Sequence, residues 1–347
     1  MDRTVAVKTN TKEYEVVIGS GLHYGQEIAK VQKPCKVVVV SDDIVFSLYA
    51  DKCVKELKSV GFDVLTYTFP NGEKSKNLST AQALLSFLAE NGISKSDLLV
   101  ALGGGVTGDL TGFVASVFLR GMEYVQCPTT LLAAIDSSVG GKTAVDLEQG
   151  KNLVGAFHQP LRVVCDTDTF QTLPKEVMSD GMAEAIKYGM IRDEALFEQF
   201  EKMSFDMADI VERCVRIKAE IVGEDEFDTG VRKLLNFGHT IGHSVEKLSS
   251  YEIPHGSAVA IGMVIVTRAY EAANGSDSSM SERLIATLQQ YQLPVSCDYS
   301  LKDLAEQAIS DKKRAGNTIS ILLPEKIGNC VICDMSMDAW IAFVAKA

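Results

Sequence analysis

The sequence has no apolar run long enough to cross a bilayer. Its most apolar stretch of interest, AVAIGMVIV (258–266), falls well short of the length that a spanning helix needs. No apolar core of signal-peptide length stands among the first residues either. We therefore expect a cytoplasmic protein with no membrane segment.

Positive charge is also scarce. The 34 Lys and Arg residues stand against 46 Asp and Glu residues, which gives a net charge of −12. This balance argues against nucleic acid as the main partner and against an anionic membrane surface. A small anionic substrate is still compatible with it, because local basic groups can override the field of the whole molecule.

The sequence also lacks a second closely spaced pair of cysteines. The eight cysteines are spread thinly, and only Cys330 and Cys333 form a C-x-x-C, with no second pair to complete a metal site. The favoured interpretation is that Cys330 and Cys333 are two residues of a late strand. Free thiols fit a reducing compartment. The chain shows no internal repeat, while its 347 residues suffice for two domains.

The first half alternates apolar strands with helical patterns, which predicts an α/β fold. Apolar runs at 36–44, 63–69, 97–105 and 124–128 are separated by helical patterns such as 78–92. Continuous apolar strands favour a Rossmann-like, mostly parallel sheet covered on both faces. In such sheets ligands bind at the carboxyl ends of the strands.

From about Pro174 onward helical periodicity dominates. We therefore divide the chain into a nucleotide-binding α/β domain at 1–174 and a mainly helical domain at 175–347. The helices expected in the second domain are 175–190, 194–202, 206–222, 232–248, 256–273, 280–290, 301–309 and 337–346, with one short strand at 318–324.

A glycine-rich stretch follows the third expected strand. ALGGGVTGD (101–109) places Gly103, Gly105 and Gly108 between a strand and a helix, where backbone N–H groups can approach a pyrophosphate. The stretch does not follow the first strand, and no acidic residue stands about 20 positions further on. Nucleotide binding is the favoured interpretation, and a tight structural turn is the alternative.

A second glycine pair precedes a lysine in SSVGGKTAV (137–145). Asp136 stands where a phosphate-binding loop of the G-x-x-x-x-G-K-[ST] type needs glycine, which excludes an NTPase loop. Lys142 is then either a cation presented to an anion or a solvated surface lysine.

The second half contains a cluster of candidate metal ligands. LLNFGHTIGH (234–243) places His239 and His243 four residues apart, about one helical turn, and His255 follows shortly after. Spacing alone pairs His239 with His243 on one helix face, together with Arg232 and Asn236. Glu184 and Lys187 stand three apart in GMAEAIKYG (181–189), where a surface salt bridge is the alternative. Glutamate and histidines suit zinc with an open position.

Nearly the whole chain resembles 3-dehydroquinate synthase, a family of sugar phosphate cyclases. The similar segments are NGEKSK (71–76), GGGVTGDLTGFVAS (103–116), FLRG (118–121), CPTTLLAAIDSSVGGKTAVD (127–146), GKNLVGAFHQP (150–160), GMAEAIKYG (181–189), LNFGHTIGH (235–243), PHGSAVAIGM (254–263) and DKK (311–313).

The resemblance implies a nucleotide-binding α/β domain followed by a mainly helical metal-binding domain. It also implies conversion of 3-deoxy-D-arabino-heptulosonate 7-phosphate to 3-dehydroquinate and phosphate, a step of the shikimate route. The chemistry implied is transient oxidation by bound NAD+, β-elimination of phosphate, re-reduction and an intramolecular aldol closure. A divalent metal is required, with zinc expected and cobalt as the alternative.

Residue roles follow from the resemblance, position by position. The metal ligands implied are Glu184, His239 and His255, and His243 becomes a contact to the substrate phosphate. The NAD contacts implied are Asp42, Glu73, Lys74, Gly104, Gly105, Asp109, Thr129, Thr130, Lys142, Lys151, Thr169 and Thr172. The substrate-site or catalytic residues implied are Arg120, Asp136, Lys142, Asn152, Lys187, Lys218, Arg232, Asn236, His243 and Lys312, with Lys313 as the alternative to Lys312.

Arg120 corresponds to an arginine that reaches into the site of a neighbouring subunit, so we expect a homodimer. Three rival functions share part of the pattern. One is a related cyclase such as 2-deoxy-scyllo-inosose synthase, which Lys187, Lys218, Arg232 and Asn236 disfavour. The others are a metal-dependent alcohol dehydrogenase of the glycerol dehydrogenase kind and an inactive NAD-sensing module.

Overall fold

The computed structural model describes residues 2–312 and 318–347, and the side chains of 310–312 lie outside that description. The chain folds into two compact units. Unit 1 comprises Met1–Leu173 and Met207–Phe227, and unit 2 comprises Pro174–Asp206 and Asp228–Ala347. None of the described helices is both long enough and apolar enough to cross a membrane.

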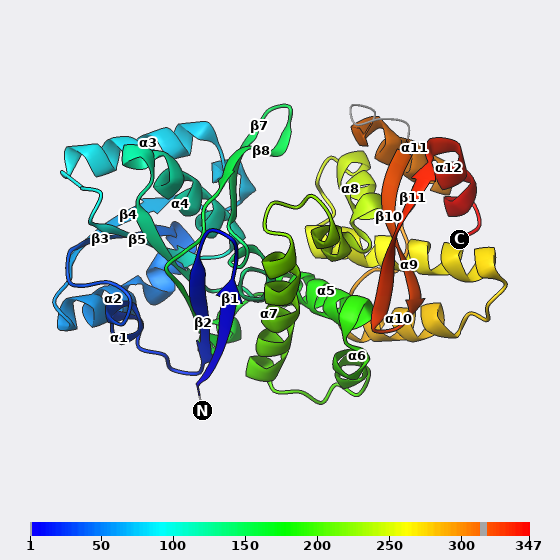
Figure 1. Cartoon of the computed structure of the whole chain (residues 1–347), viewed down its shortest axis with the longest axis horizontal. Coiled ribbons are helices and arrows are strands. Elements are labelled where there is room, and N and C mark those ends of the chain that lie inside the picture. The colour runs from blue at the N-terminus through cyan, green and yellow to red at the C-terminus, as the bar shows by residue number, and fades with distance from the viewer. Residues whose placement is uncertain (1, 313–317) are drawn as a thin grey trace. The chain divides into compact units, whose positions relative to one another are not determined.

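Unit 1 is built on a seven-stranded, mostly parallel sheet, as expected (Figure 1). Its spatial order is β1-β2-β9-β6-β5-β3-β4, and only β1 runs antiparallel to its neighbour. The strands are β1 (Arg3–Lys8), β2 (Glu13–Gly19), β3 (Lys36–Asp42), β4 (Asp63–Phe69), β5 (Leu98–Gly103), β6 (Glu123–Pro128) and β9 (Arg162–Asp166).

Side chains that alternate along the central strands belong to two separate hydrophobic cores. Val37 and Val39 of β3 join a core with helices α1 (Tyr24–Ala29) and α2 (Asp43–Ser59), whereas Val38 and Val40 face α3 (Leu78–Glu90) and α4 (Gly105–Val117). Because successive strand side chains point to opposite faces, a fully apolar strand buries both of them. Figure 1 shows α1 and α2 on one side of this sheet and α3 and α4 on the other.

Helix α7 (Met207–Glu224) differs from the sequence-based division, which put 206–222 in the second domain. It belongs to unit 1 because its buried face packs on β1 and β2. Arg3 donates to Asp209 and Glu212 at 2.8 Å each, which joins the start of the chain to this helix. Its periodicity predicted the helix but not the distant strands on which it packs.

A hairpin that the sequence did not predict projects from unit 1. It consists of β7 (Lys142–Leu147) and β8 (Gly150–Phe157), paired antiparallel (Figure 1). Asp146 anchors the hairpin, since its N–H donates to the Lys76 carbonyl at 2.8 Å and its carboxylate accepts from the Asn152 N–H at 2.7 Å. The hairpin therefore carries both glycine–lysine segments, GGK and GKN, on one short sheet.

Unit 2 is mainly helical, with one antiparallel strand pair. Its helices are α5 (Lys175–Arg192), α6 (Glu194–Glu201), α8 (His239–Leu248), α9 (His255–Asn274), α10 (Ser279–Gln290), α11 (Leu301–Lys312) and α12 (Met337–Val344). Strands β10 (Thr318–Lys326) and β11 (Asn329–Ser336) pair with each other. Cys330 is buried on β11 and Cys333 is half-exposed, and both thiols are free, as the strand interpretation expects.

The expected helix at 232–248 is wrong in its first half. A 3-10 helix, η5 (Val231–Asn236), is followed by a break at Gly238, which has φ +79° in the left-handed region, and α8 begins only at His239. A Cβ on Gly238 would lie 2.7 Å from the Val259 carbonyl of α9. Glycine is thus required both by the backbone angle and by the close approach of the two helices. Arg232 and Asn236 do not share a continuous helix face with the histidines.

Candidate active site

Three side chains of unit 2 converge on one point. They are Glu184 from α5, His239 at the start of α8 and His255 at the start of α9, and their ligand atoms all lie within 4.8 Å of one another. The Nε2 atoms of His239 and His255 each lie 3.4 Å from Glu184 Oε1. His243, which spacing alone paired with His239, is exposed one turn further along α8, and its ring centre lies 5.6 Å from that of His239.

The glycines beside the histidines explain how two helix starts come so close. A Cβ on Gly262 of α9 would lie 2.0 Å from the Gly238 carbonyl, and one on Gly242 of α8 would lie 3.2 Å from Val259. With no side chain at these positions the two helices pack backbone to backbone, and their first residues face each other. Gly238 and Gly242 lie on either side of His239, so the local sequence allows α8 to pack closely on α9.

The outer nitrogen of each imidazole is oriented by a second contact. His255 Nδ1 lies 3.3 Å from Glu246 Oε1, and His239 Nδ1 lies 3.2 Å from the Phe237 carbonyl. A carboxylate or carbonyl behind the ring fixes the tautomer and leaves Nε2 as the ligand, which is the usual support of a metal-bound histidine. Sequence reasoning missed Glu246, because nothing local to it signals the contact.

The residues present fit a divalent ion. Glu184 is fully buried, and its Oε1 has no hydrogen-bond partner although it faces both Nε2 atoms. Metal bonds of about 2.0–2.2 Å at tetrahedral angles place ligand atoms roughly 3.3–3.6 Å apart, which brackets the 3.4 Å seen here. A three-ligand set of one carboxylate and two imidazoles leaves a fourth position for water or substrate.

The protonation states of this cluster are strongly shifted. Burial lowers the pKa of His239 to about 3, so this ring is neutral and able to act as a ligand. Burial opposes a charge on His255, but Glu184 and Glu246 outweigh it and raise its pKa to about 10. Burial opposes ionisation of Glu184, yet Lys187 and the histidines hold its pKa well below the usual range.

Lys187 completes this cluster from the same helix. It is 1% exposed and makes an ion pair with Glu184 Oε2, while its Nζ lies 5.2 Å from the ring centre of Tyr188. The surface salt bridge considered from sequence is therefore wrong, because both partners are buried. Glu184 directs one oxygen at the lysine and the other at the histidines.

The remaining expected residues of unit 2 differ in accessibility. Arg232 is buried in η5, whereas Asn236 and His243 are exposed. Lys312 is the last residue of α11, and its side chain lies outside the described part of the chain, as does the whole of Lys313.

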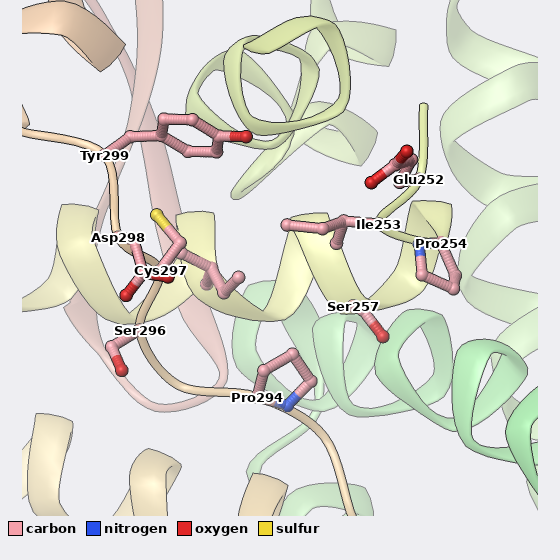
Figure 2. A pocket seen from close by; sticks show the side chains of 10 residues that line it. Glu252, Ile253, Pro254, Ser257, Pro294, Ser296, Cys297, Asp298 and Tyr299 are labelled. Atoms are coloured by element: carbon pink, nitrogen blue, oxygen red, sulfur yellow. The ribbon is translucent and has the colours of Figure 1, made fainter. Parts of the chain in front are cut away.

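A pocket of about 500 Å³ lies on unit 2 beside the start of α9. Figure 2 shows Pro254 and Ser257 on one wall and Asp298 and Tyr299 on another. None of the expected site residues lines it.

Most of the expected NAD contacts of unit 1 fall along one edge of its sheet, whereas Asp109 lies in α4 and Lys142 and Lys151 lie on the β7–β8 hairpin. Asp42 ends β3, Gly104 and Gly105 follow β5, and Thr129 and Thr130 follow β6. Glu73 and Lys74 lie in η1 (Glu73–Ser75) after β4, and Thr169 and Thr172 lie in η4 (Thr167–Thr172) after β9. These strands are neighbours in the sheet and parallel, so their carboxyl ends meet at one edge, where ligands of such sheets bind.

The glycine-rich stretch opens α4 as expected. Gly104 precedes the first helical residue and makes no side-chain cap, which leaves the first N–H groups of α4 available to an anion. A Cβ on Gly103 would lie 2.4 Å from Thr107 Oγ1, and one on Gly108 would lie 2.4 Å from Gln126 Oε1. Gly103 thus gives Thr107 its space and Gly108 lies against the end of the Gln126 side chain, while Gly104 and Gly105 form the loop itself.

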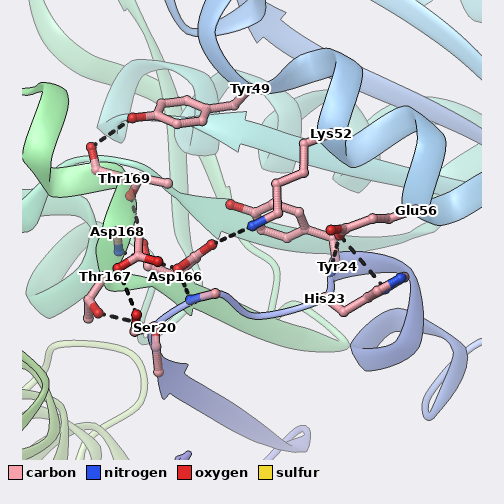
Figure 3. Close-up of polar contacts among 12 residues, drawn as sticks. Ser20, His23, Tyr24, Tyr49, Lys52, Glu56, Asp166, Thr167, Asp168 and Thr169 are labelled. Carbon is pink, nitrogen blue, oxygen red and sulfur yellow. Dashed lines mark hydrogen bonds and ion pairs between the residues drawn. The ribbon is translucent and has the colours of Figure 1, made fainter.

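The turn that holds Thr169 and Thr172 is fixed by a polar network (Figure 3). Tyr49 Oη donates to the Thr169 carbonyl at 3.0 Å and lies 2.5 Å from Thr172 Oγ1. Asp166 accepts from the Gly21 N–H at 2.9 Å and from Lys52 Nζ at 2.8 Å. Asp166 is buried at the end of β9, so these charge-assisted bonds tie the start of the turn to α2 and to the segment that follows β2.

Lys76 is a polar group that sequence reasoning missed. It is buried, and its Nζ lies 2.6 Å from both Asp109 Oδ2 and Asn152 Oδ1. It thereby joins η1, α4 and the β7–β8 hairpin, whereas the expected Lys74 is exposed. Its partners are distant in sequence, so only the fold reveals the contact.

The other expected residues of unit 1 include one ion pair and two lysines of the β7–β8 hairpin. Lys218 of α7 is buried and bonds both the carboxylate and the backbone carbonyl of Asp136. Lys142 is exposed at the start of β7, and Lys151 is half-buried at the start of β8.

Arg120 lies at the surface of unit 1 in a strained turn. It has φ +64° and the preceding Leu119 has φ +49°, a region that costs non-glycine residues about 1–2 kcal/mol each. Leu119 is 46% exposed. The turn therefore presents an apolar and a cationic side chain outward.

Comparison with known proteins defines the class. The model of the N-terminal region of 3-dehydroquinate synthase matches residues 66–180, and that of its C-terminal region matches residues 181–314. The 3-dehydroquinate synthase of Clostridium acetobutylicum is 43% identical over 341 residues, covering 95% of this chain and 96% of that protein.

Two solved cyclase structures share the fold. A 2-deoxy-scyllo-inosose synthase complexed with carbaglucose-6-phosphate, NAD+ and Co2+ has a TM-score of 0.86 and 22% identity, with 99% of each chain covered. The 2-epi-5-epi-valiolone synthase of Streptomyces hygroscopicus, with NAD+ and Zn2+ bound, also has a TM-score of 0.86, at 25% identity and 99% coverage of each chain.

The parallel sheet with its glycine-rich loop and the buried carboxylate–histidine cluster place the protein in the class of sugar phosphate cyclases. Within that class the chain belongs to the 3-dehydroquinate synthase family. It is an enzyme that converts 3-deoxy-D-arabino-heptulosonate 7-phosphate to 3-dehydroquinate and phosphate, a step of the shikimate pathway. The comparisons favour this reading over the other cyclases and the dehydrogenases.

Proposed function

We propose that Glu184, His239 and His255 hold a divalent ion, zinc by preference and cobalt as a substitute. The observation that carries the proposal is the buried Glu184 Oε1, which has no hydrogen-bond partner and lies 3.4 Å from each of two Nε2 atoms. Lys187 pairs with the other oxygen, Oε2, so Oε1 is the buried oxygen that a cation at this point would satisfy. When bound, the ion would act as a Lewis acid on the substrate's hydroxyl and carbonyl oxygens.

NAD+ is proposed to bind at the carboxyl edge of the unit 1 sheet and to supply hydride transfer. Gly104, Gly105 and the N-terminus of α4 would hold its pyrophosphate, because free N–H groups and the helix dipole favour anions there. The further contacts proposed are Asp42, Glu73, Lys74, Asp109, Thr129, Thr130, Lys142, Lys151, Thr169 and Thr172. Lys76 joins them through its bond to Asp109.

The substrate carries a carboxylate and a phosphate, and the chain offers cations for both. Arg232 and the lysines would clamp these anions, and Asn236 and His243, both exposed, would donate to the phosphate. Buried Lys187 and Lys218 would stabilise oxyanions as they develop, since charges in a dry site act strongly. The substrate residues proposed are Arg120, Asp136, Lys142, Asn152, Lys187, Lys218, Arg232, Asn236, His243 and Lys312.

The proposed chemistry assigns most of the protein's work to positioning. Oxidation of an alcohol next to the reacting carbon makes its proton acidic, and the substrate's own phosphate helps to remove that proton as it leaves. The lysines and Arg232 keep the acyclic chain in place between elimination and ring closure. Water excluded from around Glu184 and Lys187, which are 0% and 1% exposed, strengthens each of these contacts.

A homodimer in the cytoplasm is the proposed form of the enzyme. The Leu119–Arg120 turn supports the dimer, because an outward-facing strained turn with an exposed leucine gains from a partner. The low count of paired cysteines supports a reducing compartment.

The test is a stoichiometric assay. Protein stripped of metal and then loaded with zinc is given the heptulosonate phosphate and a catalytic amount of NAD+, and phosphate and carbocyclic product are both measured. We expect one phosphate and one 3-dehydroquinate per substrate consumed, with no net NADH. Activity that survives removal of all divalent metal would contradict the metal site, and NADH formed in step with product would indicate a dehydrogenase.

A further inference from the structure

Helix α9 begins without an ordinary cap. Its first residue is His255, and the residue before it is Pro254, whose side chain makes no cap hydrogen bond. The first N–H groups of any α-helix have no partner inside the helix, so they need an acceptor from elsewhere. A helix that positions a metal ligand by its first residue cannot tolerate a frayed start.

The acceptor comes from another helix. Asp180, on α5, accepts from the Ser257 N–H through its Oδ1 at 3.1 Å, and the Gly256 N–H bonds the same carboxylate. Gly256 and Ser257 are the second and third residues of α9, whose N–H groups an N-cap side chain normally satisfies. The negative charge also complements the positive end of the helix dipole.

The contact between the two helices is as close as backbone allows. A Cβ on Gly256 would lie 2.2 Å from the Asp180 carbonyl and 2.7 Å from Asp180 Oδ1, so only glycine fits. Asp180 stands one helical turn before Glu184 on α5. One turn of α5 therefore carries a ligand of the cluster and the anchor of the helix that carries a second ligand.

We propose that Asp180 is a positioning residue that caps α9 from α5 and so holds His255 in register with Glu184. The proposal rests on the metal site assigned above. The role of Asp180 differs from that of Glu246. Glu246 orients the His255 ring through Nδ1 at 3.3 Å, whereas Asp180 fixes the backbone from which that ring extends.

Metal affinity of Asp180 variants tests this role. The purified full-length protein is stripped and titrated with Zn2+ against a chromophoric chelator, and a parallel sample is loaded with Co2+ for its visible spectrum. We expect Asp180→Ala to raise the zinc dissociation constant about 10–100-fold and to change the cobalt bands, as loss of an outer support does in metal sites. Asp180→Asn keeps an oxygen acceptor, so its loss should be smaller.

A general loss of stability is separated by a matched control. Ser336 caps α12 of the same unit by accepting from the Ala339 N–H at 3.2 Å. Ser336→Ala should lower the melting temperature of the metal-free protein as a lost cap does, yet leave zinc affinity and cobalt bands unchanged. Equal loss of zinc affinity in the Ser336 and Asp180 variants would overturn the positioning role.

A double-mutant cycle shows whether the effect passes through His255. In a Glu246→Ala background, which keeps all three ligands, Asp180→Ala should lower zinc affinity less than it does in the wild type, because both residues act through His255. Full additivity of the two changes would overturn the proposal while leaving the metal site intact. A wild-type protein that takes up no divalent ion would contradict the metal site itself, and with it this role.

Discussion

At the scale of single residues, Glu184 shows how one buried carboxylate serves two groups. Its Oε2 pairs with Lys187, and its Oε1 faces the two imidazoles. Taking a carboxylate out of water costs several kcal/mol unless its oxygens are satisfied, so the lysine and a bound cation together make the position tenable. Removing either partner leaves one of the two buried oxygens without a compensating charge.

Replacing His239 by alanine should therefore abolish stoichiometric metal binding and turnover. The metal would keep one carboxylate and one imidazole, too few for a stable site. NAD+ affinity should change little, because the proposed NAD contacts all lie in unit 1 and His239 lies in unit 2. Emission spectrometry measures the metal content and checks the first expectation. Calorimetry measures NAD+ binding and checks the second. A variant that still holds one metal per chain would refute the ligand set.

His158 offers a test of pH dependence in unit 1. Burial lowers its pKa below the ordinary value of 6.5, and its Nε2 lies 2.8 Å from the Met122 carbonyl while its ring stacks on Tyr124. The unfolded chain thus binds a proton at a higher pH than the folded chain does. Stability from this group is complete above about pH 6.5 and is lost as the pH falls toward the folded pKa.

We accordingly expect the free energy of unfolding to fall on acidification below about pH 6.5, with a shallower fall in His158→Gln. The chain has five histidines, so the NMR signal missing from that variant identifies His158 directly. Its titration midpoint in the wild type should lie below 6.5. A midpoint above that value would show that the ring is not desolvated as the structure has it.

At the scale of elements, the close packing of α8 on α9 determines where the histidines lie. Gly238, Gly242 and Gly262 remove the side chains that would separate the two helices. In an open helix, changing glycine to alanine stabilises by about 1 kcal/mol. At Gly262 the added methyl would meet the Gly238 carbonyl at 2.0 Å, so the sign reverses.

Gly262→Ala should destabilise the protein by about 1–3 kcal/mol and weaken metal binding, because the helices must move apart. Ala272→Gly is the matched control, since Ala272 is exposed on the same helix and the change costs only helix propensity, about 1 kcal/mol. Denaturant unfolding and metal titration of both variants separate the effects. Wild-type metal affinity in Gly262→Ala would contradict the role given to this packing.

Much of this element structure could be predicted from local pattern. The apolar strands at 36–44 and 63–69 and most helices of the second half appear within a few residues of their predicted limits. Strands β1, β2 and β9 were missed, as was the β7–β8 hairpin, although β1 alternates between exposed and buried residues as a half-buried strand does. The break at Gly238 was also missed, since its cause is contact with α9.

Some site residues could likewise be predicted from local pattern and others could not. The glycine-rich loop and the histidine cluster carry local signals of spacing and composition. Lys76, Glu246 and Asp180 carry none, because each acts on a group far away in sequence. Spacing also misled, since His239 and His243 are one turn apart while the partners that face Glu184 are His239 and His255.

At the scale of the whole molecule, the proposed roles are divided between two units that the chain visits alternately. It leaves unit 1 after Leu173, returns for α7, and leaves again after Phe227. Lys218 thus belongs to unit 1, beside Asp136, although it stands between Lys187 and Arg232 in the sequence. Neither unit alone contains all of the proposed machinery.

The proposed dimer predicts complementation between inactive variants. If Arg120 acts in the site of the other subunit, Arg120→Ala and Lys187→Ala proteins mixed under subunit exchange should form hybrid dimers with one intact site. In an equal, random mixture about half of the dimers are hybrids, and each hybrid has one intact site of two. Activity should then return to about a quarter of wild type. No regain, with exchange demonstrated by mass spectrometry, would place Arg120 in its own subunit's site or outside any site.

The most direct test of the transient redox chemistry is a rapid-mixing measurement of NADH absorbance during a single turnover of the zinc-loaded enzyme with bound NAD+. Absorbance should rise as the substrate is oxidised and return to its starting level as product forms, with one phosphate released per site. His239→Ala should show neither phase. Absorbance that rises and stays, or product that forms in protein freed of NAD+, would contradict the account.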